Sequence, residues 1–357
     1  MPALSSPAGN RAGITVVVPV LNGADTLGDA LAALIAQTGG PRPAEIIVVD
    51  DGSRDSSRDI VAAFARQAPI RLIDGPRRGA AAAVNCGIRA ASHPLIAQID
   101  QDVAIDSGWL ERVAELFSDP RVGAVQGRYT THPHDSFYAR VMALDLEQRY
   151  DRLATDVDHV CTGNTAYRAS ALAEVGLLNE RLGYGYDNDL SYRLGAAGYR
   201  LIFCRDARSR HRWREGLAGY LSQQYGFGYG RIDVVSAHPA RVAGDDVSPV
   251  AMMGHPIVAA VALLAAASWL WAQLLGINAA PVGWTGLALA AGLMAERAVA
   301  GVRAWRKYGD IAALGFPLVH LARDLAWVAA IVVWSCRRLS GRTGGPAASM
   351  TARPVTD

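Results

Sequence analysis

The stretch ITVVVPVLNG, from Ile14 to Gly23, is an almost unbroken run of apolar and β-branched residues that ends in a turn signal. Such a run predicts a strand that is buried on both faces, as in a parallel sheet. Similar runs follow at AEIIVVD, IRLID and PLIAQID, and segments with helical periodicity separate them, including ADTLGDALAALIAQTGG and SRDIVAAFARQA. Repeated β-α-β units of this kind predict an α/β fold with a mostly parallel sheet and helices on both faces.

Composition narrows the classes of protein that fit this chain. Its 357 residues carry a formal net charge of +2, and that balance gives no support for a nucleic-acid partner. Hydrophobic residues make up 51% of the chain, and the excess is concentrated after Val250. The four cysteines show no CxxC spacing, and residues 1–12 contain no apolar core of signal-peptide length. We therefore expect free thiols, a flexible N-terminus over residues 1–12 and a cytoplasmic location for the α/β part.

Two acidic motifs fall where predicted strands end. VVDDGS places Asp50 and Asp51 after the second strand, and QIDQD places two more acids, Asp100 and Asp102, after the fourth. The carboxyl ends of parallel strands share one edge of a sheet, which is where ligands bind in such folds. Side chains two residues apart on extended backbone point the same way, so the DQD acids suit a hard divalent cation that is bound to phosphates. VVDDGS suits a planar heterocycle or a ribose. The alternatives are a helix cap for VVDDGS and a solvated loop for DQD.

Two further motifs lie later in the α/β region. GYGYDNDLSYRL puts Asp187 after a glycine-rich turn at the entrance of a predicted helix, where a carboxylate suits a positioned general base. An ordinary helix N-cap is the alternative for this residue. CTGNTAYRAS contains Gly163 and Asn164, which predict a tight turn that either exposes its amides to a ligand or has no such role.

The order of these motifs is more specific than any one of them. VVVPVLNG, VVDDGS, GAAAAVNCGI, QIDQD, GNTAYRAS and GYDNDLSYRL follow one another along residues 13–211, and in this order they resemble the family 2 glycosyltransferases with a GT-A fold. A Rossmann dehydrogenase is disfavoured, because VPVLNGAD lacks the G-x-G-x-x-G that binds pyrophosphate at the first turn. The resemblance implies a GT-A catalytic domain over residues 13–210 that uses a nucleotide-sugar donor and Mg²⁺ or Mn²⁺.

The resemblance also implies roles for individual residues. Asp102 and Asp100 would ligate the metal, and His211 would be either a further metal or diphosphate ligand or a plain surface histidine. Asp187 would be the catalytic base. The implied nucleotide-sugar-binding residues are Pro19, Asn22, Asp50, Asp51, Arg78, Asn85 and Asp100.

One position departs from the family pattern. Tyr186 stands where the family usually has a glutamate before the base, which keeps the base but changes the acceptor contact that the glutamate makes. The basic and aromatic stretch HRWREGLAGYLSQQYGFGYGR (211–231) adds arginines that suit a phosphorylated acceptor. The implied acceptor-side residues are Gly163, Asn164, Tyr186, Arg212, Arg214 and Arg231.

The last third of the chain predicts a membrane region. Residues 211–249 mix aromatic and basic side chains, as in amphipathic interfacial helices, and their arginines would hold either a lipid-linked diphosphate or anionic lipid. Apolar segments near 257–277, 279–302 and 316–336 follow within residues 250–340. Arg323 and Asp324 interrupt the third segment, and the arginine clusters after the second and third favour two spans plus a re-entrant or interfacial helix. We expect residues 341–357 to be disordered.

These features together predict an inverting, metal-dependent glycosyltransferase at the cytoplasmic face of the inner membrane. It would add one sugar to a polyprenyl-diphosphate-linked acceptor. UDP is the expected nucleotide, because the aspartate of the predicted base pocket, Asp51 or Asp50, can accept a hydrogen bond from the uracil N3–H. Guanine offers a similar donor. One alternative is a processive polysaccharide synthase, but the Q-x-x-R-W motif of such enzymes is matched only loosely near Gln223, without its tryptophan. The other alternative is a non-catalytic scaffold that binds nucleotide sugars.

Overall fold

The computed structural model describes residues 13–131 and 135–341. These residues form two compact units: the first comprises residues 13–131 and 152–212, and the second comprises residues 135–151 and 213–341. The N-terminal segment predicted to be flexible (1–12), and the predicted disordered tail (341–357) apart from its first residue, lie outside the described residues.

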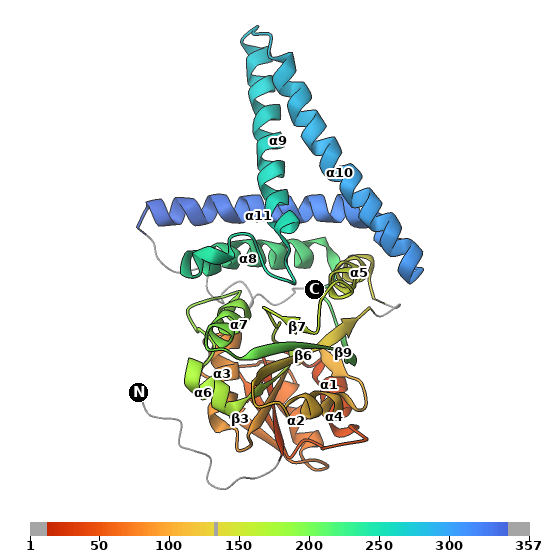
Figure 1. Ribbon diagram of the computed structural model, residues 1–357, viewed down its shortest axis with the longest axis vertical. Helices are drawn as coiled ribbons and strands as arrows, with labels where there is room; N and C mark the ends of the chain where they lie inside the picture. The colour runs from red at the N-terminus through yellow and green to blue at the C-terminus, as the bar shows by residue number, and fades with distance from the viewer. Residues whose placement is uncertain (1–12, 132–134, 342–357) are drawn as a thin grey trace. The chain divides into compact units, whose positions relative to one another are not determined.

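The first unit is a sheet with helices packed against it (Figure 1). Its strands are β1 (Ile14–Val20), β2 (Glu45–Asp50), β3 (Ile70–Asp74), β4 (Leu95–Ile99), β5 (Val103–Ile105), β6 (Val122–Thr130), β7 (Asp156–Val157), β8 (Asn164–Arg168) and β9 (Arg200–His211). Its helices are α1 (Leu27–Ile35), α2 (Ser57–Phe64), α3 (Ala80–Ala90), α4 (Trp109–Leu116), α6 (Ala169–Val175) and α7 (Tyr186–Ala196). Among the described residues the strand order is β3-β2-β1-β4-β8-β6-β9-β5, and β7 pairs with β9.

The N-terminal half of the sheet is parallel, as the β-α-β pattern predicts. β1 lies between β2 and β4, with Val18 opposite Val48. The valines of β1 are buried, because helices cover both faces of a parallel sheet. The alanine-rich α3 lies close to β1: a Cβ added at Gly87 would stand 2.3 Å from Val17 Cγ1. These strands bring the ends of β1, β2 and β4 to one edge.

The C-terminal half of the sheet adds antiparallel pairs to the parallel half. β8 pairs antiparallel with both β4 and β6, and β5 and β7 pair antiparallel with β9, while β6 and β9 are parallel. The register of β4 and β8 sets Ile99 opposite Asn164. The first residues after β4 therefore lie beside the turn that enters β8.

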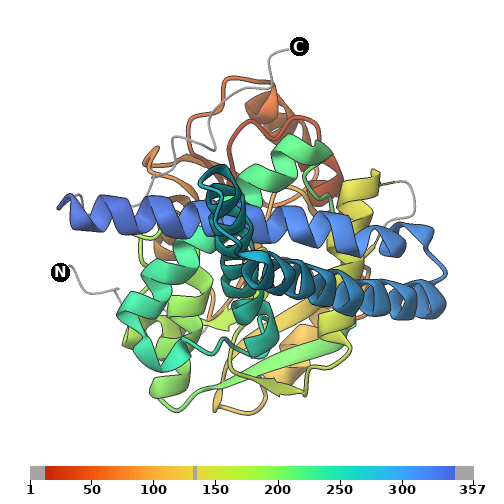
Figure 2. The same cartoon turned by 90° about the horizontal axis from the view of Figure 1, so that it is seen from above.

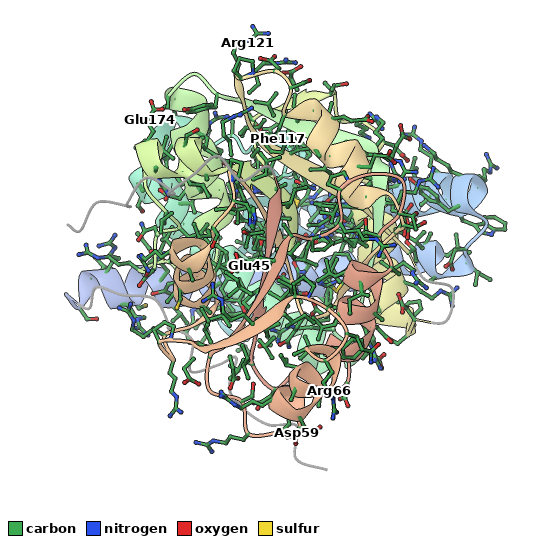
Figure 3. All side chains as sticks on the ribbon, turned by 90° about the horizontal axis from the view of Figure 1, so that it is seen from below. Glu45, Asp59, Arg66, Phe117, Arg121 and Glu174 are labelled. Atoms are coloured by element: carbon green, nitrogen blue, oxygen red, sulfur yellow. The ribbon has the colours of Figure 1, made fainter. Side chains whose placement is uncertain are left out.

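The opposite edge of the sheet, at the amino ends of the parallel strands, has a structural charge cluster. Figure 3 shows this side with Glu45 labelled near the middle of the view. The Glu45 carboxylate accepts hydrogen bonds from Thr15 Oγ1 at 3.1 Å and from Arg71 at 2.8 Å. These bonds tie β2 to its neighbours β1 and β3, so this cluster stabilises the sheet.

The second unit is helical. Its elements are α5 (Phe137–Tyr150), α8 (Gly216–Ala237), η1 (Pro239–Arg241), α9 (Val250–Leu274), α10 (Ala280–Tyr308), η2 (Ile311–Gly315) and α11 (Phe316–Leu339). Apolar side chains from α5, α8, α10, η2 and α11 share one core, which includes Leu144, Tyr220, Ala304, Phe316 and Val319. α9 packs against α10, and α11 packs over α8 while standing at a steep angle to α9 in both views (Figures 1 and 2).

Three segments of the second unit are long and apolar enough to cross a membrane. They are Val250–Leu274, Ala280–Tyr308 and Ile311–Leu339, with mean hydropathies of 2.0, 1.3 and 1.6. In the most apolar 18-residue stretch of each segment, the share of residues buried inside the protein is 44% for the third segment, 17% for the first and 22% for the second. α11 is therefore more embedded in protein than α9 or α10. The topology favoured from the sequence, two spans plus a re-entrant or interfacial third segment, stays a prediction.

Candidate active site

The DQD acids lie at the carboxyl end of β4 and are held by their neighbours. Gln98 Nε2 donates a 2.6 Å hydrogen bond to Asp100 Oδ1, and Gln98 Oε1 accepts one from the Gly163 N–H. Burial, and next the charge of Asp102, raise the pKa of Asp100 to about 6. His211 and the Gln98 hydrogen bond lower this pKa, whereas Asp187 raises it further. All these groups therefore share one electrostatic environment.

Gly163 can lie against Asp100 only because it has no side chain. Its φ is +87°, and a Cβ there would lie 2.3 Å from Asp100 Oδ2 and 2.9 Å from Tyr129 Oη. A positive φ alone disfavours other residues, and the contact with Asp100 excludes even an alanine without movement. The turn predicted at Gly163 is present, and it packs against the acid after β4.

His211 is a further metal-type ligand beside the DQD acids. It is the last residue of β9, opposite Val103 on β5, and its Nε2 lies 3.6 Å from Asp102 Oδ1. Its ring meets the ring of Tyr129 edge to face, with the centroids 5.2 Å apart. Asp102 and His211 are therefore neighbours at the end of the sheet, and both act electrostatically on Asp100. This donor set fits Mg²⁺ or Mn²⁺, and a cation there would offset the repulsion between the two acids.

Asp187 lies in the first turn of α7, and the helix N-cap is Gly185, with φ +78°. The alternative reading of Asp187 as an ordinary N-cap is therefore wrong. Its Oδ1 accepts a 2.9 Å hydrogen bond from the Asn188 N–H, and its Oδ2 lies 3.7 Å from His159 Nε2. The carboxylate is partly exposed, with 22% of the side-chain surface accessible. It can meet both a protein partner and an incoming hydroxyl group.

Tyr186 directly precedes Asp187, and the charges of Asp100 and Asp187 both act on it. Burial raises the pKa of its phenol far above the usual value, and the charges of Asp100 and Asp187 raise it further, against a hydrogen bond with Thr162. Tyr186 is therefore a neutral hydrogen-bonding group among carboxylates. A glutamate at this position would add a third negative charge beside Asp100.

The loops after β1, β2 and β4 are joined at the same edge. The Asn22 N–H donates to Ser53 Oγ, and Asn22 Oδ1 accepts from the Arg54 N–H, both at 2.9 Å. Gln101 Oε1 accepts a 2.9 Å hydrogen bond from the Leu21 N–H. The predicted pocket residue Pro19 lies on β1 directly before these loops and is partly buried. The loops therefore form a continuous rim from VVDDGS to DQD.

The two VVDDGS acids bind protein groups in this rim. Asp51 accepts hydrogen bonds from the Arg77 and Gly79 N–H groups at 2.6 and 2.8 Å. Asp50 accepts from the Ser53 N–H at 2.9 Å and from Arg58 at 2.6 Å. Burial raises the pKa of Asp50, but these hydrogen bonds outweigh burial and leave it below its usual value. Both carboxylates organise the loops around the predicted base pocket.

Two predicted ligand contacts on buried asparagines are wrong. Asn85 is 1% exposed, and its amide bonds to the Leu178 backbone and to Glu180. It fixes the segment before α7 to α3 and does not face a nucleotide. Asn164 is 0% exposed, and its Oδ1 lies beside Gly127 inside the sheet, so it does not face an acceptor.

The predicted arginines also differ in their surroundings. Arg78 pairs with Glu180 at 2.7 Å, and Arg212 donates to the Asp25 carbonyl group at 3.0 Å. Arg231 pairs with Asp245 at 2.8 Å, with 11% of its side chain exposed, which makes it a structural residue of the second unit and corrects its acceptor role. Arg214 is exposed at the start of the second unit.

Three residues of the site were not predicted. Gln98 precedes Asp100 by two residues on extended backbone, so its direction toward the same side was readable from the sequence. Tyr129 and His159 reach the site through the packing of β6 and of the segment before β8, for which the sequence gives no local signal.

Comparison with solved structures defines the class of this fold. The chain is similar to a mannosyltransferase of Pyrobaculum calidifontis that was solved with GDP-Man and Mn²⁺, with a TM-score of 0.58 and 20% identity over 94% of this chain and 89% of that one. The first unit therefore has the GT-A fold of glycosyltransferases, as expected. Residues 15–176 match the model for glycosyl transferase family 2. The chain belongs to this family.

Two curated relatives place the chain within the family. It is 32% identical over 250 residues to the pre-mycofactocin glycosyltransferase of Mycobacterium tuberculosis, which covers 67% of this chain and 51% of that protein. It is 27% identical over 316 residues to the succinoglycan biosynthesis protein ExoA of Rhizobium meliloti, which covers 86% of this chain and 91% of that protein. The match thus spans about half of the first relative and nearly all of the second.

Proposed function

We propose that this protein is an inverting glycosyltransferase that moves one sugar from a nucleotide-diphosphate sugar to a polyprenyl-diphosphate-linked acceptor at the cytoplasmic face of the inner membrane. The observation that supports this most directly is the grouping of Asp100, Asp102 and His211 with Asp187, whose charge acts on Asp100. A bound Mg²⁺ or Mn²⁺ ion, held by Asp100, Asp102 and His211, would supply positive charge to offset the charge of the leaving diphosphate.

The chemistry assigned to the protein's own groups is a single displacement. Asp187 accepts the proton of the acceptor hydroxyl group while that oxygen bonds to the anomeric carbon and the bond to the diphosphate breaks. Attack from the face opposite the diphosphate inverts the anomeric centre. Gln98 and Gly163 hold Asp100 in place, and the neutral Tyr186 contributes a hydrogen-bonding group without further repulsion.

The donor and the acceptor are proposed from different features. Asp51, directly after β2, is the proposed partner of the base, and UDP is the proposed nucleotide because this carboxylate can accept the uracil N3–H. The structural relative with GDP-Man keeps guanine as the alternative. A lipid-linked acceptor is supported by the three apolar segments of the second unit and by the similarity to a succinoglycan biosynthesis protein.

Two alternatives remain as outcomes of the test. A processive synthase would release long polymer from a defined acceptor, whereas the proposed enzyme adds one residue. A sugar-nucleotide-binding scaffold would bind donor and metal without turnover.

The test combines binding and turnover on purified full-length protein in detergent. A panel of nucleotide sugars is screened by thermal shift with and without Mn²⁺, and the donor is expected to raise the melting temperature only when Mn²⁺ is present. Transfer of labelled sugar to a polyprenyl-diphosphate acceptor is then followed for wild type and Asp102→Ala, with Asp106→Asn, an exposed acid four residues on, as control. Full transfer by Asp102→Ala would overturn the assignment of the metal site.

A further inference from the structure

A second set of metal-type ligands lies beside the proposed base. His159, Cys161 and Asp187 each offer one ligand atom, and these atoms all lie within 4.8 Å of one another. His159 Nε2 and Asp187 Oδ2 are 3.7 Å apart. His159 is 4% exposed, while Cys161 and Asp187 are partly exposed. The cluster is therefore closed on the histidine side and reachable from the other.

The chemistry of this set differs from that of the DQD acids. An imidazole, a thiolate and a carboxylate are ligands that suit Zn²⁺, whereas two carboxylates at Asp100 and Asp102 suit a harder cation. A tetrahedral zinc site with bonds of about 2.0–2.3 Å separates its ligand atoms by roughly 3.3–3.8 Å. The histidine–aspartate distance of 3.7 Å already lies in this range, and the thiol, within 4.8 Å of both atoms, needs a shift of at most about 1–1.5 Å. Three protein ligands leave a fourth position open.

The backbone that carries two of these ligands is fixed from three sides. The Cys161 N–H donates to Gln126 Oε1 on β6 at 2.7 Å, and Thr165 Oγ1 on β8 donates to the Cys161 carbonyl group at 2.5 Å. The Val160 N–H donates to Ser191 Oγ on α7 at 3.1 Å. α7 also carries Asp187, so the same contacts hold the third ligand near the other two. Such preorganisation favours metal binding, because little conformational freedom is lost.

We propose that His159, Cys161 and Asp187 form a site for a borderline-soft divalent cation such as Zn²⁺, and that its occupation inhibits sugar transfer. The inhibition rests on the proposed function, in which Asp187 is the base: an Asp187 carboxylate bound to zinc no longer accepts the acceptor proton. The site shares no ligand with the DQD acids and suits a softer cation, so excess Mg²⁺ is not expected to protect against it.

Binding is tested with Co²⁺, which reports thiolate ligation through a charge-transfer absorption. Full-length protein in excess Mg²⁺ is expected to develop this absorption with one ion per chain, and Zn²⁺ is expected to abolish it. Cys161→Ser is expected to lose the absorption, while Cys86→Ser, a matched change on α3, and Asp102→Ala keep it. No absorption in wild type, or an absorption that survives Cys161→Ser, overturns the site. Thermal melts of each variant establish that it is folded.

Inhibition is tested on the same proteins. Zn²⁺ is expected to inhibit transfer in Mg²⁺ buffer, and the concentration for half-inhibition is expected to rise at least tenfold in Cys161→Ser, measured against each variant's own zinc-free rate. Equal inhibition of both proteins overturns the inhibitory role. The cobalt absorption needs no turnover, so it still reports the site if Asp187→Asn remains active and the proposed base is wrong.

Discussion

Two partly buried acids, Asp100 in the first unit and Asp145 in the second, meet opposite surroundings. Burial raises the pKa of both. The next largest influence on Asp100 is Asp102, another acid, and its pKa rises to about 6. Around Asp145 the charges of Arg149, His320 and Arg323 outweigh burial and bring its pKa well below the usual range. One acid is repelled by its main neighbour and the other is compensated by the protein.

This difference distinguishes two kinds of acid: a binding charge, which is available to a ligand cation, and a structural charge, which is neutralised by the protein's own cations. Asp145 lies 3.1 Å from Arg149 and 3.7 Å from Arg323, so two arginines of its own unit satisfy it, and the His320 ring lies 3.6 Å away. Asp324 on α11 is likewise hydrogen-bonded to Arg297 on α10. Charges inside apolar helices are costly unless they are paired, and here they join α5, α10 and α11. The main neighbour of Asp100 is instead another acid, and the proposed cation would relieve their repulsion.

The largest expected effect is on catalysis, at Asp187. Asp187→Asn should lower the rate of sugar transfer by about 10²–10⁴-fold, because the amide cannot accept the acceptor proton. The melting temperature should change little, since the asparagine oxygen still accepts from the Asn188 N–H. Transfer rates and thermal melts on the same preparation check this. A variant with a lower melting temperature whose folded fraction still transfers sugar at the wild-type rate would show that Asp187 is a structural residue. The distinction between binding charge and structural charge would then fail at this position.

The second effect is on stability, at the pair between α10 and α11. Asp324→Asn should destabilise the second unit by about 3–5 kcal/mol, because it leaves the Arg297 guanidinium buried without its counter-charge. Both side chains are 1% exposed. Thermal melts in detergent measure the loss. The double variant Arg297→Met with Asp324→Leu should recover most of it, since paired apolar residues carry no such cost. Failure of the double variant to recover would show a role beyond pairing.

The third prediction tests the close contact that shapes the DQD site. Gly163→Ala should lower transfer at least tenfold and raise the Mn²⁺ concentration needed for activity, because the new methyl group would displace Asp100. Its matched control is Gly198→Ala: Gly198 has φ +88° but no atom within 4 Å of an added Cβ. Both variants should lose about 1–2 kcal/mol of stability from the positive φ. Equal activity of the two variants would show that the contact does not matter.

Much of the first unit follows from local sequence. β1 and β2 are almost continuous apolar runs, β3 and β4 are mostly apolar, and the i, i+2 spacing of Asp100 and Asp102 puts both acids on one side of the chain. The antiparallel β8 was not predictable in this way, because its five residues are defined by pairing with β4 and β6. The order of the motifs, taken together, still led to the GT-A fold.

The errors at the site are polar residues with distant partners. Asn85 bonds to Leu178, 93 residues away, and the partner of Arg231 is an acid on a loop that no motif marks. A polar side chain in a motif has the same sequence signal whether it faces a ligand or satisfies a buried backbone group. Only the packing of the segments distinguishes these two cases, and His159 was missed for the same reason.

The smallest expected effect is also the most direct test of the comparison, because the two units should respond with opposite signs. The raised pKa of Asp100 means that its carboxyl group contributes stability below its unfolded pKa of about 3.9 and that this contribution is lost as the pH rises through about 6. The lowered pKa of Asp145 means that its contribution is present above about 3.9 and is lost as the pH falls toward its folded pKa. In EDTA at pH 8, Asp100→Asn should therefore stabilise its unit by about 1–2 kcal/mol, while Asp145→Asn should destabilise its own.

Thermal melts at pH 5 and pH 8 measure both signs. The gain for Asp100→Asn should shrink at pH 5, where the wild-type carboxyl group is mostly protonated. With Mn²⁺ and donor added the sign at Asp100 should reverse, since the ligands stabilise wild type by mass action and the variant binds them weakly. Asp145→Asn should show no such reversal. Destabilisation by Asp100→Asn in EDTA would mean that the protein already compensates this acid, and the distinction between the two units would not hold.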